Sequence, residues 1–389
     1  MPAMPSSLLP PVLQHWRDHI LQAGANGHAL RIRGGDSKRF YGEALGPSLP
    51  TLDTREHAGI VAYEPSELVV TARAGTPLAA LEAALAEQGQ CLPFEPPHFG
   101  AGATVGGMVA AGLSGPARAS SGAVRDYVLG AQLLNGRGEH LTFGGQVMKN
   151  VAGYDVSRLL AGSLGTLGVI TEVSLKVLPV APAEATLCFE LPQADALAQL
   201  ARWRAQPLPL NASCWVHDDS GTPARDLLFV RLRGAAAAVE AACTRMLAEV
   251  AGTRQDTAAS AADWVACREQ QLPFFTPPAP DLALWRLSVA QSTPVLACPS
   301  SPLIEWHGGL RWTWAPLSDA DRLRALARQA GGHATLFRAP QANGDPEDGG
   351  PMPPRFTAPD AALLAIQRRL KAEFDPAQLF NPGRWGFLA

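Results

Sequence analysis

Seven glycines between Gly100 and Gly122, in the segment GAGATVGGMVAAGLSGPARASSG, constrain the fold of this chain more than any other feature. Most residues between these glycines are small or hydroxylated. Because glycine has no Cβ, such a segment lets backbone N–H groups approach an anion as large as a diphosphate. The segment therefore predicts an anion-binding loop, and the alternative is an ordinary flexible glycine loop.

Two other nucleotide-binding motifs do not fit this segment. Gly100, Gly102 and Gly106 approximate the glycine spacing of a Rossmann loop, but that loop must follow a buried strand. The preceding residues, CLPFEPPHF, contain three prolines where such a strand would need N–H donors. The chain also has no GxxxxGK[ST] sequence, which excludes a P-loop.

Two further glycine turns strengthen the prediction of an anion site. RIRGGDSKRF, residues 31–40, runs a short strand into a Gly-Gly turn, with Arg33 and Lys38 available to complement phosphate charge. GSLGTLG, residues 162–168, leads directly into another strand. The three segments together form a combination that few unrelated globular proteins would carry.

Apolar patterns predict two α+β units with a boundary in the proline-spaced VLPVAPAEA. In the first unit, ELVVTARAG indicates a strand, LAALEAALAEQG a helix, and an Asn135-Gly136 turn joins two strands. Residues 91–122 are nearly free of regular pattern, and GVITEVSLKVLP is one more strand. The second unit interleaves strands with helices near 194–204, 235–250 and 319–330, which predicts a mainly antiparallel sheet.

Composition narrows the function classes. The chain has 389 residues and a formal net charge of -3 without a dense block of either sign, so nothing indicates nucleic-acid binding. Its six cysteines are scattered singly, which argues against an iron-sulfur cluster or a zinc site. No apolar run reaches the length of a membrane span and no signal peptide is apparent, so a cytoplasmic protein is expected.

Five blocks, taken in order, resemble the FAD-binding subunits of bacterial glycolate oxidases, within the wider family of FAD-linked oxidases. They are RIRGGDS, PPHFGAGATVGGMVAAGLSG, VRDYVLGAQLLNGRGE, MKNVAGYDVSRLLAGSLGTLGVITEVSLKVLP and FDPAQLFNPGR. The KNxAGYD and GSLGTLGVITEV motifs are specific to that family. The resemblance is close over residues 28–180 and at the C-terminus, whereas residues 181–355 match only in layout.

The resemblance implies an α+β fold with a vanillyl-alcohol-oxidase-like, PCMH-type flavin domain of two α+β subdomains. The expected divisions are an FAD-binding domain at 1–180, an α+β cap or substrate domain at 181–340, a Pro/Gly-rich loop at 341–360 and a C-terminal helix and tail at 361–389 that packs on the FAD domain.

In that family the first glycine turn and the glycine-rich loop clasp the FAD diphosphate, and the turn near 166 meets the adenosine half. Carried over position by position, the expected cofactor-binding residues are Arg33, Gly34, Gly35, Asp36, Ser37, Gly102, Thr104, Val105, Gly106, Gly107, Gly112, Gly115, Thr166, Gly168, Val169, Ile170, Asn381 and Arg384. An ionised Asp36 would repel a diphosphate, so its carboxylate is expected to point away or to pair with Lys38 or Arg39. Relatives with covalent FAD carry a histidine just after the first turn, where Asp36 and Ser37 stand here, so non-covalent FAD is expected.

The second unit lacks the HxGDGNxH-like segment with which related dehydrogenases position and deprotonate a hydroxyl, often with a metal; no metal site is expected. The nearest catalytic candidates are His307 as a base, with Arg286, Arg311 or Arg338 as a clamp for a carboxylate. The alternative is a half-buried histidine with surface arginines.

The leading hypothesis is an FAD-binding subunit of a glycolate oxidase complex that forms glyoxylate and passes electrons onward. It implies a sister FAD subunit and an iron-sulfur subunit, with any membrane attachment made through partners. The missing histidine motif favours an electron-relaying or supporting role, with the sister subunit oxidising the substrate. The alternatives are a self-sufficient FAD dehydrogenase of another small 2-hydroxy acid and a structural assembly subunit.

Overall fold

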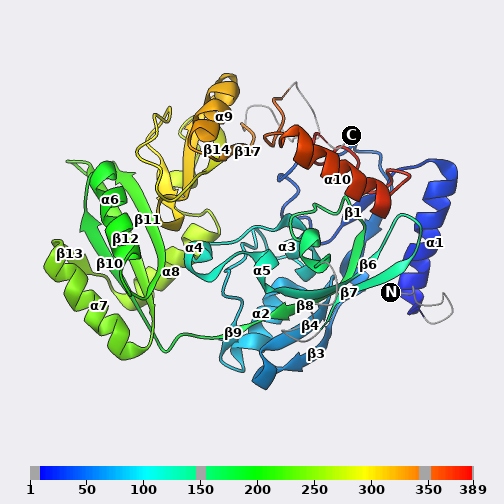
Figure 1. Ribbon diagram of the computed structural model, residues 1–389, viewed down its shortest axis with the longest axis horizontal. Helices are drawn as coiled ribbons and strands as arrows, with labels where there is room; N and C mark the ends of the chain where they lie inside the picture. Colours follow the sequence, from blue (N-terminus) through cyan, green and yellow to red (C-terminus); the bar gives the residue numbers. More distant parts are fainter. Residues whose placement is uncertain (1–8, 146–154, 341–351, 388–389) are drawn as a thin grey trace.

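The chain forms two lobes, each built on an antiparallel sheet (Figure 1). The computed structural model describes residues 9–145, 155–340 and 352–387. Most of the KNxAGYD motif and the first part of the Pro/Gly-rich loop therefore lie outside the described residues. Helices and antiparallel sheets in both lobes confirm the predicted α+β fold class.

The first lobe contains a five-stranded antiparallel sheet whose three central strands are mostly buried, whereas its two edge strands are more exposed. In spatial order the strands are β3 (Ile60–Glu64), β4 (Val69–Arg73), β8 (Val169–Lys176), β6 (Val128–Leu134) and β7 (His140–Gly144). The predicted strands around the Asn135-Gly136 turn are β6 and β7, and helix α2 (Leu78–Ala86) follows β4 as the pattern indicated.

Smaller pieces complete this lobe. They are helix α1 (Pro11–Asn26), the parallel pair β1 (Arg31–Arg33) and β2 (Thr51–Asp53), and the pair β5 (Gln90–Cys91) and β9 (Leu178–Pro179). Strand β9 is the last element before the chain enters the second lobe at β10, next to the predicted boundary.

The expectation of little regular structure at residues 91–122 was wrong. The segment contains α3 (Val105–Ala111) and α4 (Arg118–Ser121), and α5 (Val124–Tyr127) follows them. Helix α3 forms despite its glycines because the Thr104 side chain caps it and because Val105, Met108 and Val109 enter the core of the lobe. Tertiary burial thus outweighs the low helix propensity of glycine.

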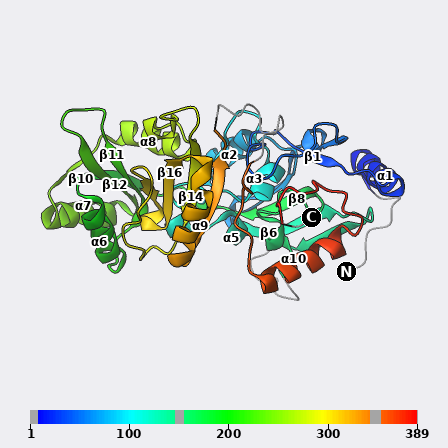
Figure 2. The ribbon, with the colours of Figure 1, turned by 90° about the horizontal axis from the view of Figure 1, so that it is seen from above.

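The second lobe is built on an eight-stranded antiparallel sheet with three helices on one face, α6 (Gln193–Arg204), α7 (Ala236–Glu249) and α9 (Ala320–Gln329). In spatial order the strands are β13 (Gly252–Arg254), β10 (Ala183–Glu190), β12 (Arg225–Gly234), β11 (Leu210–Asp218), β15 (Leu303–Glu305), β16 (Leu310–Ala315), β14 (Ala283–Ser288) and β17 (His333–Arg338). Figure 2 shows this lobe beside the first, with α9 along β14.

The other face of this sheet packs against helix α8 (Thr257–Arg268) and the glycine-rich segment of the first lobe. Trp312 and Trp314 share this face and lie in one buried cluster with Leu113. Neighbouring residues alternate between the faces: Trp285 packs in the cluster that includes α9, while Arg286 lies over the rings of Trp306 and Trp312.

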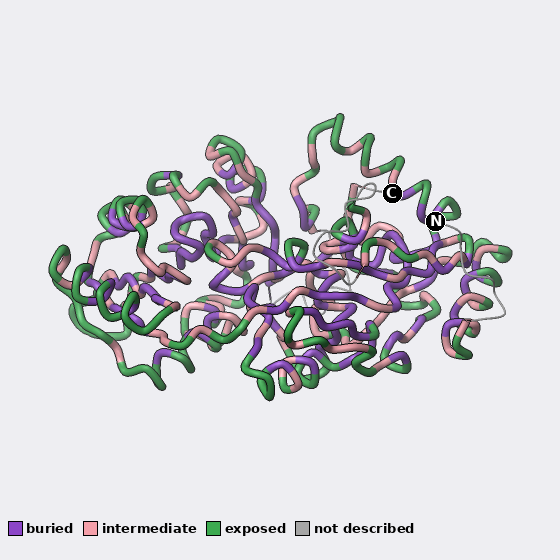
Figure 3. The backbone as a smooth tube through the Cα atoms, turned by 60° about the horizontal axis from the view of Figure 1, so that its bottom comes forward, coloured by how far each residue is buried: buried purple, intermediate pink, exposed green. Residues whose placement is uncertain are grey.

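Buried backbone runs through the region where the two lobes meet (Figure 3), and polar side-chain contacts join the lobes there. Glu95 of the first lobe accepts from Arg231 at 2.7 Å, and Trp306 donates its indole N–H to the Gly115 carbonyl at 3.0 Å. Burial alone would raise the pKa of Glu95, but the guanidinium groups of Arg231 and Arg233 outweigh it and lower that pKa. The second lobe is therefore held directly on the glycine-rich segment.

The chain ends where it began, on the first lobe. Helix α10 (Ala361–Phe374) lies on the same side of the molecule as α1 and β1 (Figure 1). The buried Lys371 ammonium donates to the carbonyls of Thr166 and Phe380 and to Asp375, and so fixes the tail to the turn at 162–168. Among the described helices, none is long and apolar enough to cross a membrane.

Candidate functional site

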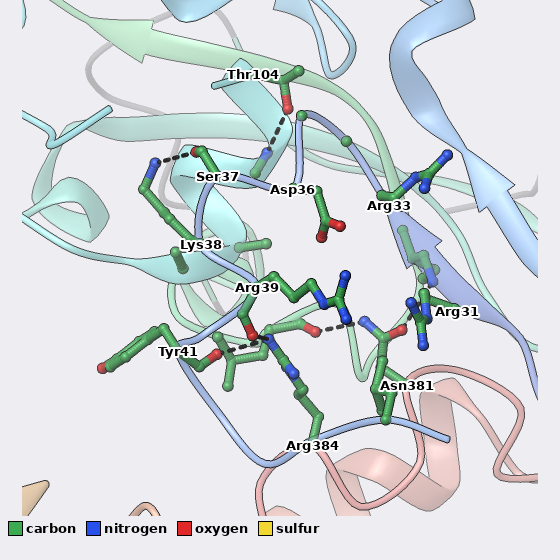
Figure 4. Close-up of a pocket in the computed structure, with 18 residues that line it drawn as sticks. Arg31, Arg33, Asp36, Ser37, Lys38, Arg39, Tyr41, Thr104, Asn381 and Arg384 are labelled. Atoms are coloured by element: carbon green, nitrogen blue, oxygen red, sulfur yellow. Dashed lines mark hydrogen bonds between the residues drawn. The ribbon is translucent and has the colours of Figure 1, made fainter. Parts of the chain in front are cut away.

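A pocket with about 710 Å³ of empty space, including space open to solvent, lies between the first glycine turn, helix α3 and the C-terminal tail (Figure 4). The turn supplies residues 31–39, the helix supplies Gly107, Ala110 and Ala111, and the tail supplies Asn381 and Arg384. Segments from the beginning, the middle and the end of the chain therefore share one site. We call it the cradle.

The first turn offers unused backbone donors. Within the described part of the chain, no backbone or side-chain acceptor pairs with the N–H groups of Gly34 to Ser37. Asp36 has a φ of 59°, and this left-handed residue helps to turn successive N–H groups toward one side, as in an anion nest. An added Cβ at Gly35 would lie 1.3 Å from the Gly102 carbonyl oxygen, so only glycine permits this contact with the second loop.

The two adjacent glycines of α3 face different surroundings, one the core of the lobe and the other the cradle. Gly106 faces the core: an added Cβ there would lie 2.6 Å from the Ala74 Cβ. Gly107 lines the cradle, and its N–H donates to the Thr104 hydroxyl at 3.2 Å. Thr104 also excludes a side chain at Gly34, because an added Cβ there would lie 2.5 Å from the same hydroxyl oxygen. A side chain at Gly34 would thus clash with Thr104, one at Gly107 would add bulk to the lining of the cradle, and one at Gly106 would disturb packing against Ala74.

Positive charge dominates the lining. The basic residues are Arg31, Arg33, Lys38, Arg39 and Arg384, and the acidic one is Asp36. The Asp36 carboxylate faces the same space as the Arg39 guanidinium (Figure 4), and the expected pairing of Asp36 with Lys38 or Arg39 stays a prediction. Arg33 pairs with Asp53 at 3.2 Å, but basic residues still outnumber acidic ones in the lining, which suits a group that carries about two negative charges, such as a diphosphate.

Lys38 is the titratable cation of the cradle. Its ammonium donates to the His98 carbonyl at 3.1 Å and to the Ser37 hydroxyl at 3.4 Å. Burial lowers its pKa to about 8, although the Glu269 carboxylate opposes the shift. The charge of Lys38 is therefore sensitive to pH just above neutrality.

The tail closes the cradle through two side chains. Asn381 accepts from the Ile32 N–H and donates to the Leu164 carbonyl, each at 2.8 Å. Arg384 donates to the carbonyls of Arg39 and Glu43 at 2.6 Å and to that of Tyr41 at 3.0 Å. Burial lowers the pKa of Arg384 to about 10, and the guanidinium remains charged at neutral pH. Arg384 thus orders the backbone after the first turn.

The structure divides the eighteen predicted cofactor residues into two groups. Nine line the cradle: Arg33, Gly34, Gly35, Asp36, Ser37, Thr104, Gly107, Asn381 and Arg384. The other nine do not line it: Gly102, Val105, Gly106, Gly112, Gly115, Thr166, Gly168, Val169 and Ile170. In the second group, Val105 and Ile170 belong to the core of the first lobe, and Gly102 and Gly106 support the loops from behind.

Nine lining residues were not among the predicted ones: Arg31, Ile32, Lys38, Arg39, Tyr41, Leu45, Ala110, Ala111 and Leu164. Most of them lie next to a predicted glycine turn in the sequence, so their nearness to such a turn could have identified them as lining residues. Leu164 lies within the predicted turn at 162–168, but only the fold brings that turn to β1 through Asn381.

Two of the catalytic candidates are held inside the second lobe. The His307 ring lies 3.0 Å from the Ser213 hydroxyl and 3.1 Å from that of Ser120, and burial lowers its pKa to about 4. Arg311 is fully buried and donates to the carbonyls of Thr293 and Gly308. These contacts give both residues structural roles, and neither lines a described pocket.

The other two candidates lie near the junction of the lobes. Arg338 donates twice to Gln270 and covers the Phe40 ring at 4.0 Å. Arg286 lies over the rings of Trp306 and Trp312 and lines a second pocket at the junction. Among the four candidates, Arg286 alone lines one of the two pockets described here.

Neither disulfides nor a metal cluster mark the site. All six cysteines lie in the described part of the chain and are free thiols. No group of three or more His, Cys, Asp or Glu side chains in residues 9–145, 155–340 and 352–387 is arranged to hold a metal ion.

Comparison with known proteins identifies what the cradle resembles. Residues 13–144 match the family model of an FAD binding domain, a range that includes the first turn and α3. The chain is 45% identical to the glycolate oxidase subunit GlcE of Escherichia coli over 368 residues, which cover 94% of this chain and 95% of that protein. It is also 35% identical to a D-2-hydroxyglutarate dehydrogenase of Xanthomonas citri over 138 residues, which cover 35% of this chain and 29% of that protein.

Solved structures confirm the fold. An alkyldihydroxyacetonephosphate synthase superposes with a TM-score of 0.64 at 16% identity, covering 94% of this chain and 74% of that one. The predicted PCMH-type flavin fold is therefore confirmed, and FAD is the cofactor that the family binds. The residues present fit it, because unpaired N–H groups, five cations and glycines without room for a Cβ surround one pocket.

Proposed function

Because this chain belongs to the GlcE family of glycolate oxidase subunits, we propose that it is the FAD-binding subunit of an oxidoreductase complex that converts glycolate to glyoxylate. The observation that carries the proposal is the cradle, formed by three distant segments within a chain that is similar to GlcE along almost its whole length. FAD, when bound, supplies two-electron oxidation of an alcohol.

Different residues of the cradle bind different parts of FAD. The N–H groups of Gly34 to Ser37 and the surrounding cations bind the diphosphate, and Gly107 leaves room for it. The side of the cradle lined by Leu164 and Asn381 receives the adenosine half, in line with the expectation for the 162–168 turn. Arg384 supports the site from behind by ordering the backbone at 39–43.

Electrons leave this chain through partners. Its cysteines are free and are not grouped as an iron-sulfur cluster requires, so a separate iron-sulfur subunit and a sister FAD subunit complete the complex. The complex works in the cytoplasm, and any attachment to the inner membrane comes through those partners.

One experiment separates this proposal from the two alternatives. The chain is purified alone, its flavin spectrum is recorded, and glycolate or D-lactate is added under anaerobic conditions. Bound FAD that bleaches only when the partner subunits are present supports a complex subunit. Rapid bleaching by the chain alone supports a self-sufficient dehydrogenase, and absence of FAD supports an assembly role. Either of the last two results contradicts the proposal.

A further inference from the structure

The end of helix α8 in the second lobe reaches the first lobe through the side chain of Glu269. Its carboxylate accepts from the backbone N–H of Phe99 at 2.8 Å and from that of His98 at 3.1 Å. The Arg268 guanidinium donates to the same carboxylate at 2.8 Å, and the Glu269 side chain is only 11% exposed. One residue of the second lobe therefore holds the backbone that leads into the glycine-rich segment.

This backbone has a conformation that needs such a restraint. Phe99 has a φ of 53°, in the left-handed region, which a bulky residue adopts only where its surroundings impose it. Two N–H groups that point at one carboxylate supply the restraint, because hydrogen bonds to a charged acceptor are stronger than those to a neutral one. Glu269 thus stabilises the turn at residues 98–99.

The peptide group between His98 and Phe99 connects Glu269 to Lys38 in the cradle. Its N–H donates to Glu269, and its carbonyl oxygen accepts from the Lys38 ammonium at 3.1 Å. A peptide group is planar, so its N–H and C=O point in opposite directions, and fixing one fixes the other. The carboxylate and the ammonium therefore lie at opposite ends of one amide dipole, and each faces the end of opposite sign.

Glu269 also affects the charge of Lys38. Burial lowers the pKa of Lys38 to about 8, and the negative charge of Glu269 opposes that shift. Without this carboxylate the ammonium would lose its proton at a lower pH. The other charged or titratable side chains around Lys38 come from the first turn, the tail, β17 and the segment that Glu269 holds: they are Asp36, Arg39, Arg384, Arg338, and His98 with its partner Glu82.

We propose that Glu269 is a positioning residue of the second lobe, which fixes the Lys38 ammonium in place and supports its positive charge toward the FAD diphosphate. The inference rests on the proposed function, because that function places the diphosphate in the cradle. It gives the second lobe a part in holding the cofactor: the affinity for FAD depends on the contact of α8 with the backbone at 98–99.

The pH dependence of FAD binding tests this role. The full FAD-loaded chain is diluted at a series of pH values, and flavin fluorescence measures the FAD that dissociates. In the wild type we expect the affinity to decline above about pH 8, where Lys38 loses its proton. Glu269→Gln keeps the size and one acceptor but removes the charge, so the decline should begin at least about half a pH unit lower. At about pH 6.5 the two affinities should agree within ~3-fold, because Lys38 is protonated in both chains.

Two further chains isolate the contact. Glu249→Gln is the matched control, because Glu249 ends helix α7 of the same lobe and accepts from Trp203 and Arg245 but does not line the cradle. Its pH profile should equal that of the wild type. In a Lys38→Met chain, Glu269→Gln should leave the pH profile unchanged, because the group through which it acts is gone.

Glu269→Asp separates the position of the charge from its presence. Aspartate keeps the carboxylate but withdraws it by one methylene from the backbone at 98–99. The decline in affinity should therefore begin between the values for the wild type and for Glu269→Gln. Thermal unfolding shows whether each variant keeps its fold, and Glu269→Asp carries the test if Glu269→Gln does not fold.

Four results would overturn the proposal. They are an equal loss of affinity at every pH in Glu269→Gln, a profile in either Glu269 variant that equals the wild-type profile, a shift that persists in the Lys38→Met chain, and a wild-type chain without FAD. The last result also contradicts the proposed function. A wild-type chain that binds FAD, with unshifted profiles in the variants, overturns the role of Glu269 alone.

Discussion

Asn381 and Ile32 are 349 residues apart in the chain, yet the Asn381 side-chain oxygen accepts the Ile32 N–H at 2.8 Å. The same amide donates to the Leu164 carbonyl, so one residue of the tail binds both β1 and the 162–168 turn. Asn381 has a φ of 42°, a left-handed conformation that asparagine tolerates better than most residues. The C-terminal segment is therefore part of the cradle.

Removing the Arg384 guanidinium should loosen the cradle. Arg384→Met leaves the carbonyls of Arg39, Tyr41 and Glu43 without their donor. We expect the free energy of unfolding to fall by about 2 to 4 kcal/mol, with weaker FAD binding. Urea unfolding and FAD titration measure both, with exposed Arg368→Met on α10 as the control. Equal stability of the two variants would contradict the role given to Arg384.

FAD binding should weaken as pH rises above neutrality because of Lys38. With a pKa of about 8 in the free site, Lys38 loses its charge as the pH rises through that value. A bound diphosphate favours the protonated form, so affinity is highest below pH 8 and declines above it. We expect Lys38→Met to bind FAD more weakly at neutral pH and to lose most of this decline. Titrations at about pH 7 and about pH 9 compare the two chains; parallel profiles would count against the prediction.

Acid should destabilise the fold partly through His307. Its pKa is about 4 in the folded chain and 6.5 ordinarily, so the unfolded chain binds the proton first as pH falls. Stability is therefore complete above pH 6.5 and declines toward pH 4, by up to about 3 kcal/mol for this residue. His307→Asn should be less stable at neutral pH but less sensitive to acid. Chemical unfolding at about pH 7.5 and about pH 4.5 tests this, and an unaltered acid sensitivity would refute it.

The flavin should be held without a covalent bond. The first turn carries Asp36 and Ser37 where covalent relatives have histidine, and no histidine or cysteine lines the cradle among the described residues. Precipitation with acid is expected to release all flavin into the supernatant, where absorbance quantifies it. Yellow colour that stays with the washed precipitate would show a covalent link.

The glycine turns that line the cradle were predictable because their signal is local. The Gly34-Gly35 turn and the glycine-rich segment are recognisable from composition alone, and the structure brings both to one pocket. The difference between Gly106 and Gly107 was not predictable, since it depends on which glycine of α3 faces Ala74. Helix α3 itself was missed because burial of Met108 and Val109, and not helix propensity, stabilises it.

Contacts between charged residues far apart in the chain could not be predicted from the sequence either. Glu95 and Arg231 are 136 residues apart, and no local pattern indicates that they form a buried pair between lobes. Arg286 was one of three arginines that the sequence offered equally as a clamp for a carboxylate. Only the alternation of side chains along β14 and the approach of the glycine-rich segment bring it, and not Arg311, to the second pocket, at the junction of the lobes.

Flavin content of the purified chain tests the central claim most directly, namely that this chain holds FAD in the cradle. Gly107→Val adds bulk to the lining at a backbone that other residues can adopt, whereas Gly221→Val adds the same bulk to an exposed loop of the second lobe. We expect wild type and Gly221→Val to carry FAD, and Gly107→Val to bind it at least ~10-fold more weakly with an unchanged fold, equal to about 1.4 kcal/mol. Equal flavin content in all three chains would contradict the account.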